Sequence, residues 1–256
     1  MLIWLVLIPL IAAALIGLCK APARPTALLS ASLTLALGIW ALVSFDGCSS
    51  CWSRFEGMDL QLTLAPALSK VMLLLTILVT FATVLGTNPP QGGEASWYNS
   101  ALLISAGATG AFLSDNIISF FAFHELALIP TFVMIGLYGR GDRRTTAWRA
   151  TLYLGLASMV LLAALLMIGT QAGFTFSGLK DFMASGRELA HAELIGALLI
   201  AGFGTLISLF PFHSWAAPAY ASAPAPVAMM HAGVLKKFGL YGLFMFQPLM
   251  ETGFLP

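Results

Sequence analysis

Glu125 is a carboxylate near the middle of a long apolar stretch. It lies ten residues after Asp115 and fifteen before Arg140, which places it about 15 Å along a helix with a rise of 1.5 Å per residue. An ionisable group at that depth in a membrane costs about 3 kcal/mol on insertion scales and usually faces a partner or water. The position therefore favours a functional role for Glu125 over a purely structural ion pair.

A second set of polar residues lies in the apolar segment 224–247. Lys236 and Lys237 are adjacent, so they project to different faces of a helix, and His231 precedes them by up to two turns. Burial disfavours the charged form of a lysine, whereas a nearby carboxylate favours it again. A set of Glu, Lys and His side chains is therefore suited to passing protons, although a packing role explains His231 alone equally well.

Two neighbours of Glu125 have open interpretations. His124 points about 100° away from it around a helix, and it is either a proton relay near neutral pH or a hydrogen-bonded packing residue. Pro130 cannot donate a hydrogen bond to the carbonyl of Leu126, which leaves a polar backbone group within one turn of the carboxylate. A simple kink is an equally good explanation of this proline.

The composition predicts the element that must position these residues. Of 256 residues, 59% are hydrophobic and 9% are charged, whereas about 25% of the residues of a soluble domain are charged. The apolar residues form runs of about 20, the length of a membrane-spanning helix. We expect an all-α, polytopic membrane protein with about eight spans, at approximately 2–18, 26–45, 66–87, 98–114, 116–138, 147–169, 192–210 and 224–247.

Several boundaries of these segments are informative. The first segment has no preceding Lys or Arg, so it is interpreted as a retained span and not as a signal peptide. Asp115 and Asn116 form a tight polar turn between the fourth and fifth segments. The seventh segment ends at Pro211, and prolines recur from Pro218 to Pro226. These prolines predict a broken helix, which at membrane depth survives only inside protein or beside water.

The charged loops predict an orientation. Loops after odd-numbered segments carry more Lys and Arg than the others, chiefly from Arg140 to Arg149, which places that cluster in the cytoplasm and both termini outside. Cys48 and Cys51 then lie in an extracytoplasmic loop, which favours a local disulfide over a redox-active dithiol.

Other functional classes have little support. The net charge is +1, and no basic stripe with interleaved aromatic residues indicates a nucleic acid partner. The spacing of His, Cys, Asp and Glu matches no metal site, and no glycine-rich loop follows a strand. We expect no cofactor in this chain.

Two stretches resemble a known family. FFAFHELALIPTFVMIGLYG (120–139) resembles the fifth span of the antiporter-like subunits of proton-pumping NADH:quinone oxidoreductase (complex I). PFHSW (211–215), followed by SAPAPVAMMHAGVLKKFGLYG (222–242), resembles the break in their seventh span and their eighth span. The likeness is greatest to the M-type, or chain 4, subunit, and Mrp-type cation/proton antiporter subunits are relatives.

The resemblance implies roles for individual residues. Glu125 matches the fifth-span glutamate of the family, Lys237 its eighth-span lysine, and His231 a histidine found there in some members. Residues 1–96 would contain spans one to three, and residues 97–256 the first five-helix repeat, spans four to eight with a broken seventh helix. The second, inverted repeat of the family would be missing. The implied site is a proton half-channel that opens toward the cytoplasm.

One position departs from the family pattern. The family has a seventh-span lysine that pairs with the glutamate, and this sequence has Leu206 there. The P-D-A-H motif after the tryptophan is also altered, to Pro218-Ala-Tyr-Ala. Either Lys236 replaces the missing lysine as the partner of Glu125, which we favour slightly, or the unit no longer pumps in the standard way.

The sequence therefore supports one leading function and two alternatives. We expect a non-redox, proton-translocating membrane subunit of a respiratory NADH:quinone oxidoreductase, in a bacterial inner membrane. Its partners would be the bilayer and other membrane subunits, including sibling antiporter-like subunits, and it would meet quinone only through partner subunits. The alternatives are an Mrp-type cation/proton antiporter subunit and a structural subunit with a decayed channel.

Overall fold

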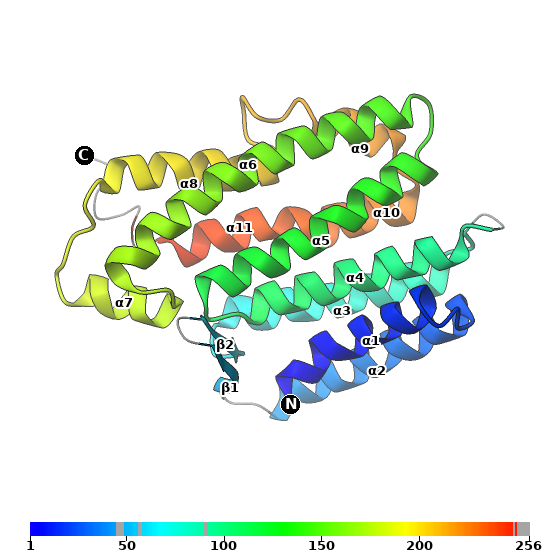
Figure 1. Cartoon of the computed structure of the whole chain (residues 1–256), viewed down its shortest axis with the longest axis horizontal. Helices are drawn as coiled ribbons and strands as arrows, with labels where there is room; N and C mark the ends of the chain where they lie inside the picture. Colours follow the sequence, from blue (N-terminus) through cyan, green and yellow to red (C-terminus); the bar gives the residue numbers. More distant parts are fainter. Residues whose placement is uncertain (45–48, 56–57, 90–91, 248, 250–256) are drawn as a thin grey trace.

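The apolar segments form helices that lie side by side along the long axis of the molecule (Figure 1). The computed structural model describes residues 1–44, 49–55, 58–89, 92–247 and 249. Its elements are α1 (Leu2–Gly17), α2 (Ala23–Ser44), β1 (Ser49–Phe55), β2 (Met58–Thr63), α3 (Ala67–Gly86), α4 (Glu94–Leu113), α5 (Ile117–Tyr138), α6 (Arg143–Ala172), α7 (Phe176–Ala184), α8 (Ala192–Ile207), α9 (Ala216–Ser222), α10 (Ala225–Met230), a π-helical turn η1 (His231–Leu235) and α11 (Lys236–Met245).

Within the described part of the chain, four helices are long and apolar enough to cross a bilayer. They are α2, α3, α5 and α6, whereas α1 and α8 are apolar but have 16 residues each. Many large apolar side chains on these helices face outward, as lipid contact requires. Examples with at least half of their surface exposed are Trp4, Leu29, Val43, Val71, Ile129 and Leu156.

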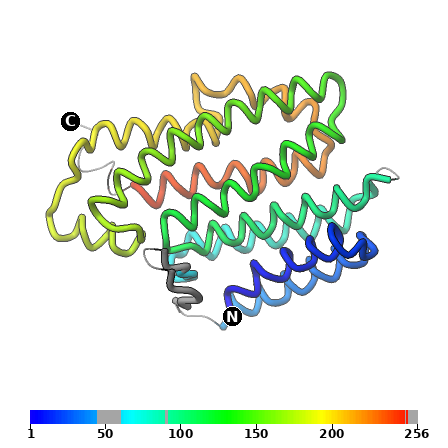
Figure 2. The backbone as a smooth tube through the Cα atoms, viewed as in Figure 1, coloured from blue at the N-terminus to red at the C-terminus, as the bar shows by residue number. Residues whose placement is uncertain are grey.

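The helices pack in layers. α4 contacts α1, α2 and α3 on one side and α5 on the other, and α6 packs on α5 and α8. The chain trace in Figure 2 shows α1 and α2, in blue, as the outermost pair of the N-terminal half. The larger cluster of buried apolar residues includes side chains from every described helix, and a smaller one joins residues of α1, α2, α3, α4 and β2.

The β1–β2 hairpin differs from the all-α expectation, and α7 is a helix outside the eight expected segments. β1 and β2 form an antiparallel hairpin in what the sequence indicates is a polar loop, and α7 is a short helix that buries Phe176, Leu179 and Phe182. Both are too short to produce an apolar run of membrane-spanning length, which is why hydropathy does not predict them. The proposed disulfide cannot be located, because Cys48 lies outside the described residues.

The predicted turn between the fourth and fifth segments is confirmed. α4 ends at Leu113 and α5 begins at Ile117. The side-chain oxygen of Asn116 accepts hydrogen bonds from the backbone N–H groups of Ile118 (2.9 Å) and Ser119 (3.1 Å). This N-cap satisfies donors that the first helical turn leaves free, so it fixes the residue at which α5 starts.

The predicted helix break is also confirmed. α8 ends at Ile207, and Ser208 adopts a left-handed conformation with φ of 63°. Helical structure resumes at Ala216 and is interrupted again before Pro224. The indole Nε1 of Trp215 donates a hydrogen bond of 3.0 Å to the carbonyl of Thr205, so one backbone acceptor at the end of α8 is satisfied inside the protein.

Candidate functional site

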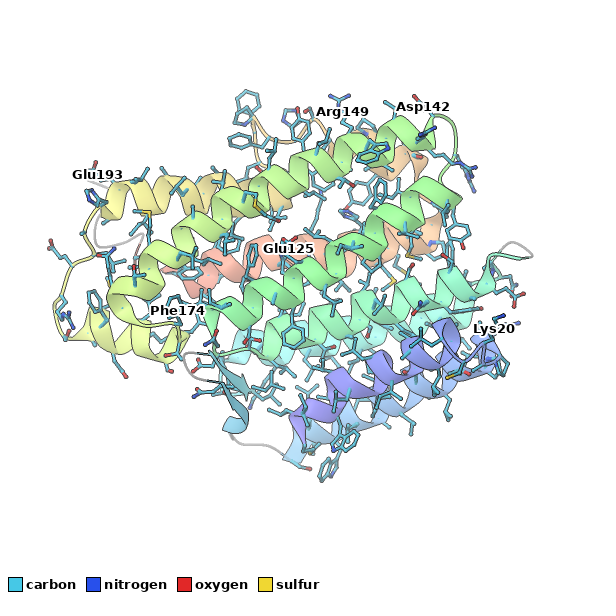
Figure 3. The ribbon with its side chains drawn as sticks, viewed as in Figure 1. Lys20, Glu125, Asp142, Arg149, Phe174 and Glu193 are labelled. Carbon is cyan, nitrogen blue, oxygen red and sulfur yellow. The ribbon has the colours of Figure 1, made fainter. Side chains whose placement is uncertain are left out.

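Glu125 lies on α5 about midway between the two ends of the bundle. Figure 3 shows it between Lys20 and Asp142 at one end and Glu193 at the other. Its side chain is 32% exposed, so the carboxylate is neither fully enclosed nor on the open surface. This placement agrees with the mid-span depth expected from the sequence.

A close approach of α4 fixes the backbone on both sides of Glu125. A Cβ atom added to Gly107 on α4 would lie 2.6 Å from the carbonyl oxygen of Phe123 and 2.9 Å from the amide nitrogen of Ala127. Only glycine allows the two backbones to come this near. The contact determines which face of α5 packs on α4, and therefore which face carries Glu125.

A cavity of about 150 Å³ adjoins the carboxylate, between α5, α6 and the π turn. Its walls are mostly apolar side chains of α5 and α6, but Glu125 and His231 both line it. Since a water molecule occupies about 30 Å³ in the liquid, the cavity has room for several waters. The structure thus brings together, around one cavity, two of the four residues that the sequence singles out.

The immediate neighbours of Glu125 are His124 and Ser158. His124 Nδ1 lies 3.2 Å from Glu125 Oε1, and the His124 side chain is completely buried. The hydroxyl of Ser158, from α6, lies beside the carboxylate and has no hydrogen-bond partner in the described structure. The adjacent histidine, although it starts on a different face of the helix, reaches the carboxylate with its ring.

His231 begins the π turn and is 4% exposed. Its Nδ1 lies 3.3 Å from the hydroxyl of Tyr220, and its ring lies 5.4 Å from that of Trp215. Its Nε2 is buried without a hydrogen-bond partner among the described residues. Because buried polar atoms nearly always find a partner, Nε2 is a natural contact for water in the cavity.

Lys236 does not contact Glu125. Its ammonium nitrogen lies 4.8 Å from the ring centre of Tyr220 and 5.8 Å from that of Trp215, distances at which a cation is attracted by an aromatic face. The pairing of Lys236 with Glu125 that the sequence favours is therefore absent from this arrangement. In the described part of the chain the one ion pair within 4.0 Å is that of Glu125 with His124.

The remaining site residues lie on α8 and α11. Lys237 is partly buried and follows Lys236 at the start of α11. Leu206, in the position of the missing lysine, is 3% exposed and packs in the main core. In the described residues no group of three His, Cys, Asp or Glu side chains could hold a metal ion.

Two residues near the site are not among those that the sequence singles out. Tyr220 contacts both His231 and Lys236, and Ser158 lies beside Glu125. Tyr220 lies in the Pro218-Ala-Tyr-Ala stretch, which departs from the family pattern. This departure is a sequence feature from which Tyr220 could be identified as a candidate site residue. Ser158 is one of many small polar residues on apolar helices, and nothing in its local sequence distinguishes it.

Comparison with known proteins gives a consistent result. Residues 114–255 match the family model described as NADH:quinone oxidoreductase/Mrp antiporter, transmembrane. NAD(P)H-quinone oxidoreductase chain 4 of Microcystis aeruginosa is 33% identical over 195 residues, which is 74% of this chain and 34% of that protein. A chain 4 protein of Picosynechococcus is 32% identical over 75% of this chain and 36% of its own length. The chain thus spans about a third of the length of these relatives.

Solved structures share the fold. A chain of respiratory complex I from Thermus thermophilus superposes with a TM-score of 0.85 at 26% identity, covering 99% of this chain and 54% of the other. A chain of the Mrp complex from Dietzia gives a TM-score of 0.80 at 22% identity, covering 95% and 47%. At that second level of identity the likeness concerns the fold alone.

Proposed function

Because this chain belongs to the NADH:quinone oxidoreductase/Mrp antiporter family of membrane subunits, we propose that it conducts protons as a non-redox subunit of a respiratory NADH:quinone oxidoreductase. The relatives named above as NAD(P)H-quinone oxidoreductase chain 4 support this choice. Electron transfer from NADH to quinone would take place in partner subunits, and this chain would add no cofactor of its own.

The observation that carries the proposal is the cavity shared by Glu125 and His231. A carboxylate and an imidazole around water-sized space can exchange protons through ordered water, since each group can both accept and release one. The other lining residues are apolar except for Thr131 and Thr151. This keeps the local dielectric constant low, which strengthens the effect of each charge. Lys236 and Lys237 continue the polar residues along α11.

The proposed arrangement is a half-channel within spans four to eight of about eight transmembrane helices. Residues 1–96 would supply the first three spans and residues 97–256 the five-helix repeat. The half-channel would open toward the cytoplasm of a bacterium, with the chain in the inner membrane beside sibling antiporter-like subunits. Discontinuous helices near a midplane site are the general pattern of such transporters, and the break between α8 and α10 supports this assignment.

Two specific observations support other functions. The fold likeness to the Dietzia Mrp chain supports a cation/proton antiporter subunit, which would carry Na⁺-dependent transport without quinone reductase activity. Leu206, buried in place of a lysine, supports a structural subunit with a decayed channel, in which neutralising Lys236 and Lys237 would affect neither pumping nor growth.

The proposal is tested with Glu125→Gln in the assembled complex reconstituted into liposomes. Glutamine keeps the shape of the side chain but cannot exchange a proton, so we expect NADH-driven proton flux to fall by about a hundredfold. Glu193→Gln is the matched control, because Glu193 is exposed at the start of α8. Unchanged flux in a fully assembled Glu125→Gln complex would remove Glu125 from the mechanism.

A further inference from the structure

The Glu125 carboxylate needs a positive partner, because it lies at mid-helix in a largely apolar surrounding. Neither lysine of α11 forms an ion pair with it in the described structure, and Lys236 faces aromatic rings instead. The side chain that does reach the carboxylate is His124, at 3.2 Å.

Packing alone does not explain an imidazole at position 124. The side chain is completely buried, and its ring lies nearly perpendicular to that of Phe238 on α11, with the centroids 5.1 Å apart. An aromatic or aliphatic side chain could fill this space, whereas the imidazole leaves Nε2 buried without a hydrogen-bond partner in the described residues. Burying a polar atom without a hydrogen-bond partner costs free energy, so an imidazole at this position indicates a role beyond packing.

The contact itself requires a proton. A neutral Nδ1 with a free lone pair and an ionised carboxylate are both acceptors, so at 3.2 Å they would repel. A protonated Nδ1 beside the carboxylate gives attraction instead. A neutral imidazole with its hydrogen on Nδ1 would attract the carboxylate mainly through a directed hydrogen bond, and the pair lacks that geometry. The attraction is therefore chiefly that between an imidazolium and the carboxylate, and the apolar surroundings strengthen it.

We propose that His124 is the charge partner of Glu125, with an imidazolium Nδ1 that keeps the carboxylate ionised until a proton arrives from the cavity. This inference rests on the proposed function. When an excess proton that has entered the cavity is passed through its waters to the carboxylate, Glu125 becomes a neutral acid, the waters remain neutral, and the attraction between the two charges ends. His124 packs on Phe238, the residue after Lys237, so the positive charge left unpaired lies next to α11.

The test compares two substitutions in the reconstituted complex. His124→Phe keeps an aromatic ring against Phe238 and removes Nδ1. Phe121→Leu is the matched control, because the Phe121 ring lies 6.3 Å from that of His124 and the change alters packing there without removing a charge. The two readouts are NADH-driven proton flux and the infrared carboxylic acid band of Glu125, which is assigned by its disappearance in Glu125→Gln.

We expect His124→Phe to reduce flux roughly tenfold or more, because removal of one partner leaves a buried charge uncompensated. The same variant should show a protonated Glu125 at neutral pH, whereas Phe121→Leu should retain both flux and an ionised carboxylate. If His124→Phe does not assemble, His124→Asn is measured in its place, since its amide can donate but cannot carry a charge, and the same results are expected.

The outcomes separate the two proposals. Retained flux and an ionised Glu125 in the His124 variants, with Glu125→Gln inactive, would overturn the role of His124 and leave proton conduction in place. Retained flux in Glu125→Gln itself would overturn proton conduction through this residue, and the role of His124 with it.

Discussion

At the scale of single residues, the site is a set of polar atoms that each have too few protein partners. His231 Nε2 and Glu125 Oε1 are both buried without a hydrogen-bond partner among the described residues, and both residues line one cavity. A fully paired polar network stabilises one arrangement, whereas unpaired groups around a space for water can change their protonation state. Glu125 and His231 are unpaired groups of the second kind, and for this reason we interpret them as proton-exchanging residues and not as a structural polar network.

Tyr220→Phe tests how His231 is oriented. The tyrosine hydroxyl lies 3.3 Å from Nδ1, and donation to Nδ1 would leave the proton of a neutral imidazole on Nε2, the ring nitrogen without a partner in the described residues. We expect Tyr220→Phe to lower proton flux about 2- to 10-fold, equivalent to the loss of one hydrogen bond, with assembly unchanged. The measurement is flux in proteoliposomes, and flux at the unaltered level would show that Tyr220 does not act on His231.

The residues of the site could be predicted from the sequence only in part. A glutamate at mid-segment is visible from charge and depth alone, so Glu125 follows directly from hydropathy. The contacts of Lys236 depend instead on where the α9 helix folds back, since Tyr220 and Trp215 belong to the broken region. The placement of Glu125 and His231 around one cavity depends on how α5 and the π turn pack, and the pattern of apolar segments in the sequence does not predict this packing.

At the scale of elements, apolar length predicts the helices well and loop structure poorly. The expected segment 147–169 corresponds to α6, which runs from Arg143 to Ala172. Its first turn carries Arg143 and Arg144, which an apolar segment does not include. The hairpin β1–β2 and helix α7 were not predicted, since neither has a long apolar run. The π turn at His231 was also not predicted, because one extra residue in a helical turn leaves no clear sequence signal.

Gly107→Ala tests the close approach of α4 and α5. Its new Cβ would lie 2.6 Å from a backbone oxygen, so the two helices must separate, and we expect a loss of about 1 to 3 kcal/mol of stability. Gly155→Ala on α6 is the matched control, because a Cβ there meets nothing within 4 Å. Thermal unfolding of the purified complex in detergent measures both. Equal transition temperatures for the two variants would contradict the tight packing.

At the scale of the whole molecule, the loops divide between two ends as an alternating topology requires. Figure 3 shows Lys20 and Asp142, from the first and fifth loops, at one end of the bundle, and Glu193 at the opposite end. The excess of Lys and Arg in the odd loops predicts that their end faces the cytoplasm.

Thiol labelling tests this orientation. Cys19 is exposed and free, so with Cys48 and Cys51 replaced by serine it becomes a reporter for the first loop. We expect an impermeant maleimide to label Cys19 only in inverted membrane vesicles, and the same result for a cysteine at position 142 (Asp142→Cys). A cysteine at position 193 (Glu193→Cys) should be labelled only in intact spheroplasts. The opposite labelling pattern would contradict the predicted orientation. Labelling in permeabilised membranes is the control that each cysteine can react with the maleimide.

The central claim is that protons reach Glu125 through the cavity it shares with His231, and Gly155→Leu tests it most directly. Gly155 lines that cavity, and its Cβ position is open, so leucine can fill the space without altering a titratable group and also suits a helix better than glycine. Measured as NADH-driven proton flux in the reconstituted complex, Gly155→Leu should reduce flux about tenfold or more, whereas Gly155→Ala should reduce it little. Flux equal to that of the unaltered protein in an assembled Gly155→Leu complex would contradict a proton route through this cavity.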